Sequence, residues 1–515
     1  MTTDQPAEHV PEPEGEPFED DGLPEQMRVR RAKLDSLRER GIEPYPVAFA
    51  RTDTLGEVRD RFGDLDTDAA TGERVAVAGR IILKRDGGKL CFATLRDGTD
   101  DLQVMLSLDR VGEDALASWK HDIDLGDHVG VEGEVITSRR GELSVLADRF
   151  TLTSKSLRPL PDKHKGLTDP EARVRMRYVD LIVRPEARDM LHLRAGVVRA
   201  IRDTMHARGY TEVETPMLQV LHGGANARPF VTHVNAYDLP LYLRIAPELY
   251  LKRLLVGGAE QVFEINRNFR NEGADSSHNP EFTMLEAYQA YGDYTTMREL
   301  TQTLIQAAAT EAFGEPVARR VEADGQVHEY DLSGQWPVRT MIGALSEALG
   351  EQVGLDTPVE ALQAHARSAG LDEPPQATTP MLLEELYVEL VERTTTTPVF
   401  YQDFPKENAP LTRVHREEPR LTEKWDLVCW GAEQGTGYSE LTDPVDQAER
   451  FYQQSLRAAG GDEEAMQVDE DFLRALEYGM PPAGGVGVGI DRLIMSLTGL
   501  GIRDTILFPL VKPRS

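Results

Sequence analysis

Two strand-like segments with charged faces lie close together in the middle of the chain and constrain its fold more than any other feature. Within 263–272 the apolar residues Phe263, Ile265 and Phe269 fall on odd positions and every even position is polar, a period of two that is typical of a half-buried strand. Arg270 and Glu272 therefore share one face. Gly273 and Asn279 then predict a turn. After the turn, one side of a second strand carries Phe282, Met284, Glu286 and Tyr288. The pattern predicts a β-hairpin with two charged faces side by side.

Three stretches, in this order, resemble the motifs of a known enzyme class. Residues 209–216 look like motif 1 of the class II aminoacyl-tRNA synthetases, the hairpin looks like motif 2, and residues 485–493 look like motif 3. Within that class, the chain is similar to the lysyl-tRNA synthetase family of subclass IIb at residues 223–230, 246–253 and 437–441. The resemblance implies activation of L-lysine with ATP to lysyl-adenylate and pyrophosphate, followed by transfer of lysine to the 3′ end of tRNA(Lys).

The expected fold class is α+β. Alternation between residues 73 and 152 predicts five strands, with a helix near 114–120 between the third and the fourth. This order is typical of an OB-fold β-barrel, which commonly binds single-stranded nucleic acid. The resemblance implies a second, catalytic domain built on an antiparallel sheet flanked by helices.

The expected domains follow from these segments and from composition. Residues 1–25 hold nine acidic and no basic residues, so we expect a disordered acidic tail. The other expected parts are an N-terminal helix and OB-fold anticodon-binding domain at 26–157, a linker at 158–185, and a class II catalytic domain at 186–515 with a helical insertion near 315–395.

Cysteine content and hydropathy indicate the compartment. Cys91 and Cys429 are the only cysteines in the sequence and cannot build a disulfide framework. The N-terminus lacks a basic region followed by an apolar core, and no apolar run approaches the ~20 residues of a membrane span. We expect a cytoplasmic protein with no membrane partner.

The net charge of -31 argues against a nucleic-acid partner, but its distribution is uneven. Two groups of basic residues could contact phosphates. They could equally be solvated helix faces and a charged linker. The first group is Arg28, Arg30, Arg31, Lys33, Arg38 and Arg40, and the second is Lys155, Arg158, Lys163, Lys165, Arg173, Arg175 and Arg177.

The resemblance assigns an ATP site, in which the substrate carboxylate would attack the α-phosphate. This carboxylate is already a nucleophile at neutral pH, so the protein must supply positioning and positive charge. The planar fork of Arg270 suits a bridge between the carboxylate and the α-phosphate. The other implied roles are adenine contacts from Glu272 and Asn279, stacking by Phe282, contacts to the β- or γ-phosphate from His278 and to the γ-phosphate from Arg492, and Mg²⁺ ligation by Asp426 and Glu433.

A pocket for the lysine side chain is implied by several acidic residues. Buried carboxylates disfavour acidic and apolar substrates, because an unpaired buried charge costs about 2 to 5 kcal/mol. By resemblance, the ε-ammonium group of lysine would contact Glu286, Tyr288 and Glu440. The α-ammonium group would contact Glu248 and the Gly224 carbonyl. The other parts of the lysine substrate would contact Arg270, Thr436 and Tyr438. Thr436 stands where many family members have Asn, Tyr438 where they have Phe, Asp426 where they have Glu, and Ser277 where a basic residue is common.

The resemblance also implies partners. Arg85, Phe92 and Gln103 would read the tRNA anticodon, although Phe92 could instead belong to the core of the barrel. Motif 1 implies a homodimer, although a helix followed by such a strand could be ordinary core structure. Two alternatives to the main function are a lysine ligase acting on a protein or another amine acceptor, whose members tend to lack the barrel, and a catalytically inactive paralogue, which should have lost Arg270, Glu272 or Arg492.

Overall fold

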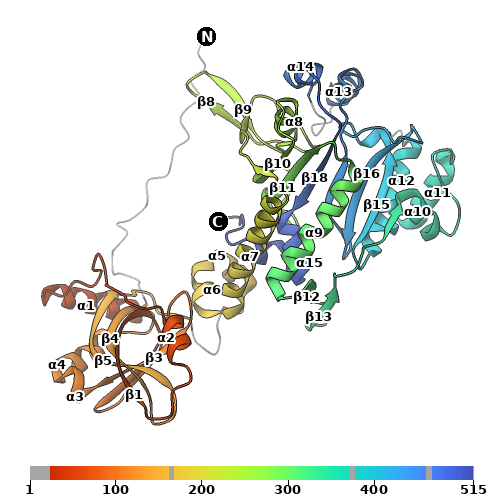
Figure 1. Ribbon diagram of the computed structural model, residues 1–515. Helices are drawn as coiled ribbons and strands as arrows, with labels where there is room; N and C mark the ends of the chain where they lie inside the picture. Colours follow the sequence, from red (N-terminus) through yellow and green to blue (C-terminus); the bar gives the residue numbers. More distant parts are fainter. Residues whose placement is uncertain (1–23, 162–166, 276, 372–376, 460–466, 514–515) are drawn as a thin grey trace. The chain divides into compact units, whose positions relative to one another are not determined.

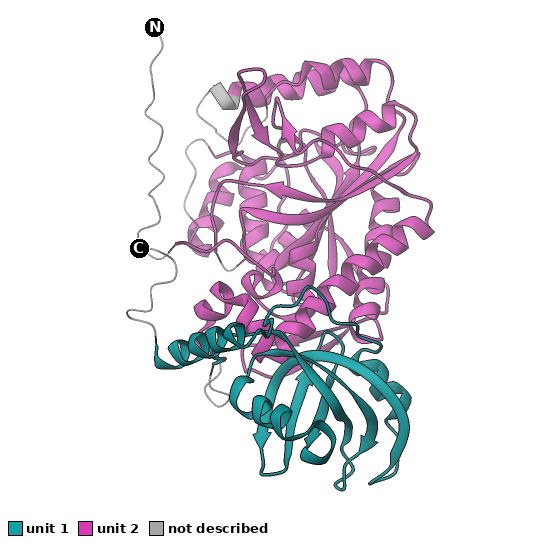
Figure 2. Ribbon diagram, turned by 90° about the vertical axis from the view of Figure 1, so that its left-hand side faces the viewer, with its two compact units in different colours: residues 1–166 teal, residues 167–515 magenta. Residues whose placement is uncertain are grey.

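The computed structural model describes residues 24–161, 167–275, 277–371, 377–459 and 467–513. Outside these ranges lie residues 1–23 of the expected acidic tail. Lys163 and Lys165 of the second basic group also lie outside them. The chain divides into two compact units, residues 1–166 and 167–515 (Figure 2). Among the described helices, none combines the length and the apolar character needed to cross a bilayer.

The first unit is a closed five-stranded barrel (Figure 1). Its strands are ordered β1-β2-β3-β5-β4, and helix α4 lies between β3 and β4 in the chain, which confirms the predicted OB-fold. The elements are α1 Glu25–Glu39, α2 Leu55–Phe62, β1 Ala70–Asp86, β2 Leu90–Arg96, β3 Asp101–Ser107, α3 Leu108–Val111, α4 Glu113–Asp122, β4 His128–Thr137 and β5 Leu143–Ser154.

Alternation along the strands builds the core of the barrel. On β2, Cys91, Ala93 and Leu95 are buried, whereas Phe92 on the opposite face is only half-buried. Since side chains alternate across a strand, Phe92 lies on the outer face and is not a core residue.

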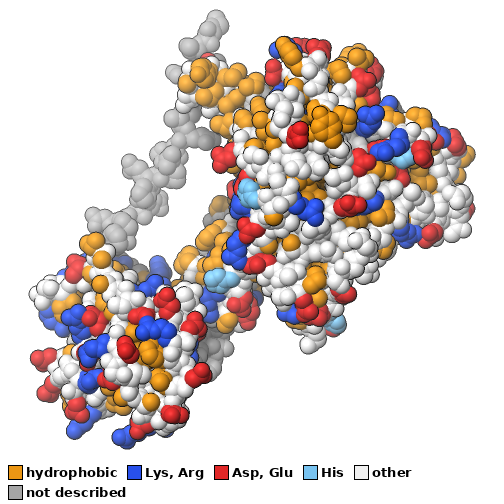
Figure 3. All heavy atoms as spheres, in the orientation of Figure 1, with side chains coloured by type: hydrophobic (Ala, Val, Ile, Leu, Met, Phe, Trp, Pro, Cys, Tyr) orange, Lys and Arg blue, Asp and Glu red, His pale blue; other side chains and the backbone are white. Residues whose placement is uncertain are grey.

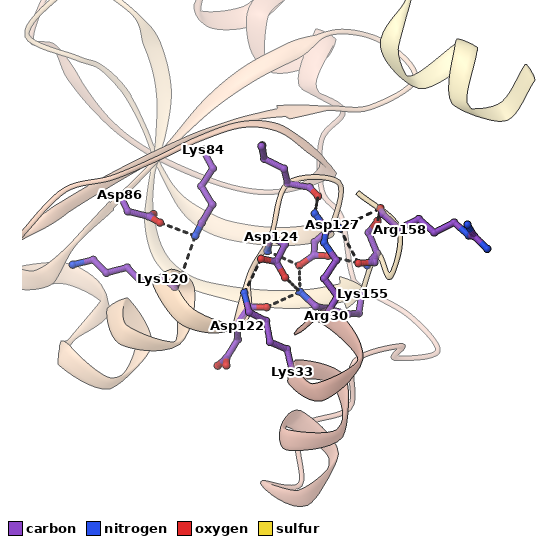
Figure 4. Close-up of polar contacts among 12 residues, drawn as sticks. Arg30, Lys33, Lys84, Asp86, Lys120, Asp122, Asp124, Asp127, Lys155 and Arg158 are labelled. Atoms are coloured by element: carbon purple, nitrogen blue, oxygen red, sulfur yellow. Dashed lines mark hydrogen bonds and ion pairs between the residues drawn. The ribbon is translucent and has the colours of Figure 1, made fainter. Parts of the chain in front are cut away.

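Ion pairs and hydrogen bonds connect helix α1 to the barrel (Figure 4). Lys155 on the segment after β5 is fully buried, and its Nζ lies 2.6 Å from Asp124 Oδ2 and 2.8 Å from Asp127 Oδ2. From α1, Lys33 Nζ contacts Asp124 Oδ1 at 2.6 Å. The Arg30 guanidinium donates to backbone carbonyls of the chain around residues 125, 156 and 158. These three cations of the two basic groups therefore hold the unit together.

We predict that Lys155→Met destabilises the barrel by about 3 to 5 kcal/mol, because it leaves Asp127 buried without its cation. Hydrogen exchange of the β1–β5 amides, measured by mass spectrometry across a urea series, would report this change. The matched control is Arg149→Met, which removes an exposed ion pair with Glu132 and should leave the exchange profile unchanged. Equal protection in both variants would contradict the role given to Lys155.

The second unit is built on an eight-stranded sheet ordered β14-β15-β16-β17-β18-β11-β10-β6. Smaller sheets β12-β13 and β7-β9-β8 accompany it. The strands are β6 Thr211–Glu212, β7 Leu218–Gln219, β8 Val231–Val234, β9 Leu239–Leu243, β10 Gln261–Phe269, β11 Glu281–Ala290, β12 Val317–Val321, β13 Val327–Asp331, β14 Val338–Thr340, β15 Val399–Pro405, β16 Leu421–Cys429, β17 Ala432–Ser439 and β18 Ala483–Gly489. The predicted motif 2 hairpin is β10-β11, which pairs Asn268 with Phe282 and Glu264 with Glu286.

Helices cover both faces of this sheet. One face packs on α7, α9 and α15 through a core that includes Phe263, Leu285 and Val488, and the other packs near α8, α13 and α14 through Tyr288, Phe451 and Phe472. The helices are α5 Pro170–Arg175, α6 Arg177–Val183, α7 Pro185–Ala207, α8 Glu248–Val256, α9 Tyr294–Phe313, α10 Met341–Leu349, α11 Val359–Ala369, α12 Thr379–Leu390, α13 Pro444–Ala459, α14 Glu470–Glu477, α15 Ile490–Thr498 and α16 Ile502–Thr505, with 3₁₀ turns η1 Glu392–Thr394 and η2 Lys406–Asn408.

Two segments differ from their expected structure. The expected linker is helical from Pro170 onward, and Arg177 of its α6 is buried, where it contacts Asp180 at 2.7 Å and donates to the Leu507 carbonyl. The expected helical insertion near 315–395 begins with the β12-β13 hairpin and is mainly helical only from Met341. The Asp-Gly turn at Asp324, between two valine-bearing segments, favours that hairpin.

Candidate active site

Three neighbouring strands of the large sheet bring predicted lysine-binding residues together. Across the sheet, Glu286 on β11 lies opposite Gly487 on β18, and Gly487 lies opposite Thr436 on β17. In the next row, Tyr288 lies opposite Gly485, which lies opposite Tyr438. Cross-strand neighbours stand about 5 Å apart, so the two glycines open a space between the polar side chains of β11 and β17.

The glycine at 485 is required by its surroundings. A Cβ atom there would overlap the Glu440 carboxylate and lie 2.6 Å from a ring carbon of Tyr288. Gly224 faces a similar restriction, since its φ is +87° and a Cβ would lie 3.0 Å from the Cβ of Glu248. Both positions therefore exclude any larger residue.

The strands and the motif 2 loop enclose a cavity of about 630 Å³. This volume suits a small-molecule substrate pair. Asp426 and Glu440 are not among the residues that line the cavity. The predicted residues that do line it are Gly224, Glu248, Arg270, Glu272, His278, Asn279, Phe282, Glu286, Tyr288, Glu433, Thr436, Tyr438 and Arg492.

One end of the cavity is cationic. The Arg270 guanidinium lies 5.1 Å from the centre of the Phe282 ring. Arg492 Nη2 lies 3.2 Å from His278 Nε2, and Arg492 Nη1 donates to the Glu433 carbonyl at 3.1 Å. Because arginine has no acceptor, His278 accepts at Nε2 and carries its proton on Nδ1, next to Asp275 at 3.0 Å. Two arginines and an oriented histidine are suited to bind a polyanion.

Two predicted ATP residues are held by backbone groups. Glu272 Oε1 accepts from the Arg228 amide at 3.2 Å. The Asn279 side chain donates to the Glu281 carbonyl at 2.5 Å and accepts from the Leu510 amide at 3.2 Å. The bonds of Asn279 connect the motif 2 hairpin to the C-terminal segment.

The two predicted metal ligands lie on adjacent strands. Burial, together with Asp426, raises the pKa of the Glu433 carboxyl, while Arg492 opposes this effect. Asp426 Oδ2 contacts Lys424 Nζ at 3.0 Å, whereas its Oδ1 is buried without a hydrogen-bond partner. Within the described ranges, no group of three or more His, Cys, Asp or Glu side chains could hold a metal ion. The pair therefore fits a cation that also takes oxygens from a substrate.

The other end of the cavity is anionic. Glu286 is 5% exposed, and its Oε2 accepts from the Tyr288 hydroxyl at 3.3 Å. Burial, reinforced by Glu248 and opposed by Arg270, raises the pKa of Glu286 to about 8. Glu248 is 3% exposed, and its Oε2 accepts from the Tyr438 hydroxyl at 2.9 Å. The hydroxyl of Tyr438, where many relatives are expected to have Phe, thus orients Glu248.

Sequence reasoning missed Lys252. This residue is fully buried on α8, and its Nζ contacts Glu248 Oε1 at 2.7 Å and also pairs with Glu440. Burial opposes the charge of Lys252, but the two carboxylates outweigh burial and raise its pKa. Its position four residues after Glu248 on a helix was the available sequence signal. Glu440 does not line the cavity, and its Oε2 is paired with Lys252, whereas its Oε1 is buried without a hydrogen-bond partner. The contact of Glu440 with the substrate ammonium stays a prediction.

The three predicted anticodon residues share the outer face of the barrel. Arg85 on β1 is paired with Phe92 on β2, and Gln103 on β3 is paired with Thr94, two residues from Phe92. The Gln103 amide donates to Ser144 Oγ on β5 at 2.8 Å. An aromatic ring, a guanidinium and an oriented amide on one open face could stack on and hydrogen-bond a base.

Comparisons with known proteins agree with both units. Residues 169–512 match the family model described as tRNA synthetases class II (D, K and N), and residues 75–153 match an OB-fold nucleic acid binding domain. The chain is 58% identical over 501 residues to a lysine–tRNA ligase of Kineococcus radiotolerans, an alignment that covers 97% of this chain and 99% of that protein. It is 57% identical over 501 residues to lysine–tRNA ligase 1 of Mycobacterium tuberculosis, with 96% and 98% covered.

A further relative has a longer chain. The lysylphosphatidylglycerol biosynthesis bifunctional protein LysX of Nocardia farcinica is 52% identical over 491 residues, which cover 95% of this chain and 43% of that protein. The family match over most of the second unit places the chain among the class II tRNA synthetases. Within this class it belongs to the lysine–tRNA ligase family, to whose members it aligns over nearly the whole of both lengths.

We predict that the KM for lysine falls as the pH rises from about 6.5 to about 8.5, by up to ~10-fold per pH unit. The Glu286 carboxyl is largely protonated below its pKa of about 8, and an ammonium group would bind only its ionised form. ATP–pyrophosphate exchange at each pH would give the KM. The KM for ATP serves as the internal control, and Glu286→Gln should flatten the profile. A pH-independent KM in the unaltered enzyme would contradict this coupling.

Proposed function

We propose that this chain activates L-lysine with ATP and transfers it to tRNA(Lys). The observation that carries the proposal is the polarity of the cavity. Glu286 and the Tyr288 hydroxyl lie at one end, and Arg270, His278 and Arg492 lie at the other. A zwitterionic substrate with a cationic side chain fits next to a triphosphate in this arrangement.

Positioning and charge supply the chemistry of the first step. The lysine carboxylate attacks the α-phosphorus, a P–O bond forms, and pyrophosphate leaves with the electrons of the broken P–O bond. Arg270 would bridge the carboxylate and the α-phosphate, since its fork can donate to both. Arg492 and His278 would neutralise the leaving pyrophosphate. We assign the bound Mg²⁺ to Glu433 and Asp426, where it would reduce repulsion among the phosphate oxygens.

Glu286 and Glu248 would provide specificity for the amino acid. We propose that Glu286 and Tyr288 contact the ε-ammonium, and that Glu248 with the Gly224 carbonyl contacts the α-ammonium. Thr436 lines the cavity, and its hydroxyl donates to the Trp425 carbonyl at 3.2 Å. This bond leaves a hydroxyl lone pair, but no second proton, for the substrate.

We further propose a homodimer. Exposed apolar side chains gather on and beside the β7-β9-β8 sheet, and Figure 3 shows hydrophobic atoms over the β8-β9 region. Exposed apolar patches commonly mark protein interfaces, and sedimentation should therefore give twice the 57.4 kDa chain mass. The exposed residues are Met217, Leu218, Val220, Leu221, Val231, Tyr237 and Leu239.

Both cysteines are free and buried, which supports a cytoplasmic location.

The central test is ATP–pyrophosphate exchange with each of the twenty amino acids, followed by charging of tRNA. We expect exchange with L-lysine and charging of tRNA(Lys). Exchange with another amino acid in place of lysine would refute the assignment of the pocket. Exchange with lysine but no charging would favour a ligase that acts on a different acceptor.

We predict that Phe92→Ala spares lysine-dependent exchange but lowers kcat/KM for tRNA(Lys) charging by about 5- to 150-fold, the equivalent of losing one base stack of ~1 to 3 kcal/mol. The matched control is Tyr178→Ala, an exposed aromatic residue of the second unit, which should change neither reaction. Loss of exchange in Phe92→Ala would show that the tasks of the two units are not separable.

A further inference from the structure

One buried carboxylate joins a helix, a strand and a second helix of the second unit. Asp491, in the first turn of α15, is 2% exposed, and its Oδ1 lies 2.6 Å from Arg194 Nη1 on α7. Its Oδ2 accepts from the backbone amide of Thr283 on β11 at 2.7 Å. Arg194 Nη2 donates to Thr283 Oγ1 at 3.1 Å. These contacts form a closed triangle of Arg194, Thr283 and Asp491.

The triangle lies where the strand β18 ends and α15 begins. The pairing of β11 with β18 ends at Met284 and Gly489. Beyond this pair, the Asp491 carboxylate takes the place of a strand, because it accepts the next amide of β11 on that side. Its position in the first turn of a helix also favours a negative charge. The carboxylate therefore fixes the start of α15 to the start of β11.

Arg194 holds the triangle to the rest of the unit. Its guanidinium is 13% exposed, and Nη1 also donates to the Thr505 carbonyl at the end of α16 at 3.3 Å. A planar guanidinium can serve several acceptors at once in a fixed geometry. Arg194 thus neutralises Asp491 and fixes its direction at the same time.

Two corners of the triangle are neighbours in sequence of expected ATP contacts. Thr283 follows Phe282, whose side chain would stack on adenine. Asp491 precedes Arg492, which would bind the γ-phosphate. All four residues line the cavity. The triangle therefore joins the strand that carries one end of the ATP site to the helix that carries the other end.

We propose that Arg194 and Asp491 are positioning residues for ATP: the triangle sets the separation between Phe282 and Arg492. A nucleotide that spans both residues gains affinity from a fixed separation, because neither group must be rearranged on binding. A ligand that contacts one of the two residues alone gains nothing from it. This inference rests on the proposed activation of lysine with ATP.

Ligands of different length test the proposal in ATP–pyrophosphate exchange. Asp491→Ala removes both contacts of the carboxylate, so we expect the KM for ATP to rise about 10- to 100-fold. Adenosine reaches the Phe282 end and pyrophosphate the Arg492 end. The inhibition constant of adenosine and the KM for pyrophosphate should each change by less than about 3-fold. The KM for lysine should stay constant.

Two results of this comparison would overturn the proposal. If adenosine and pyrophosphate lose as much affinity as ATP, the triangle maintains the fold of the site and does not set a separation. An unchanged KM for ATP would show that the separation does not depend on Asp491.

Variants of Arg194 examine the other side of the pair. Arg194→Met should raise the KM for ATP, whereas Arg194→Lys keeps a cation beside Asp491 and should restore most of the affinity. Equal losses in these two variants would contradict the electrostatic role. The matched control is Arg199→Met on the same helix, which removes an exposed ion pair with Glu311 and should leave all the constants unchanged.

The double variant Arg194→Met with Asp491→Ala leaves neither charge without its partner. It should be no worse than Asp491→Ala alone, because both substitutions act through one triangle; additive losses would contradict this. If Asp491→Ala does not fold, the double variant takes its place in the ligand comparison. Failure of both to fold would assign the triangle to stability and overturn the proposal. Absence of lysine-dependent exchange in the unaltered enzyme would refute the proposed function itself.

Discussion

The burial of charged side chains, and the need to compensate each of them, determines how this molecule is built. Isolated charges in a protein interior are costly, whereas charges in matched sets are tolerated. Arg244 with Glu264, Lys424 with Asp426, and Lys252 with its two glutamates are such sets around the cavity. Glu286 lines the cavity, and its carboxylate accepts a hydrogen bond from the Tyr288 hydroxyl.

The same site depends on Gly485 and Gly487 on the cavity side of the strand β18. β18 passes between β11 and β17, and a side chain at Gly485 would overlap Glu440 and crowd Tyr288. The strand still contributes Val486 and Val488 to the core on its other face. One short strand therefore closes the hydrophobic core on one side and opens the substrate cavity on the other, which is possible because side chains alternate with a period of two.

Local periodicity predicted the elements that carry their own pattern. The alternation around Arg270 and Glu286 predicted the β10-β11 hairpin, and the barrel strands were predicted in the same way. The pairing of Glu440 with Lys252 was not predictable, because Lys252 comes from a helix distant in the sequence and meets Glu440 only through the tertiary fold. The β12-β13 hairpin was missed because its strands are short and its surroundings are rich in helix-forming residues.

The resemblance predicted most residues of the candidate site, and the structure shows which of them line the same cavity. Charge alone did not reveal the purpose of the basic residues in α1: Arg30 and Lys33 bind groups of the barrel itself. This fastening has a consequence for recognition of a polyanion. Arg28 and Arg38, exposed on the same helix, stand on a scaffold that is already ordered before any ligand arrives. An approaching nucleic-acid backbone would therefore meet charges on an ordered helix, and little backbone entropy would be lost in the encounter.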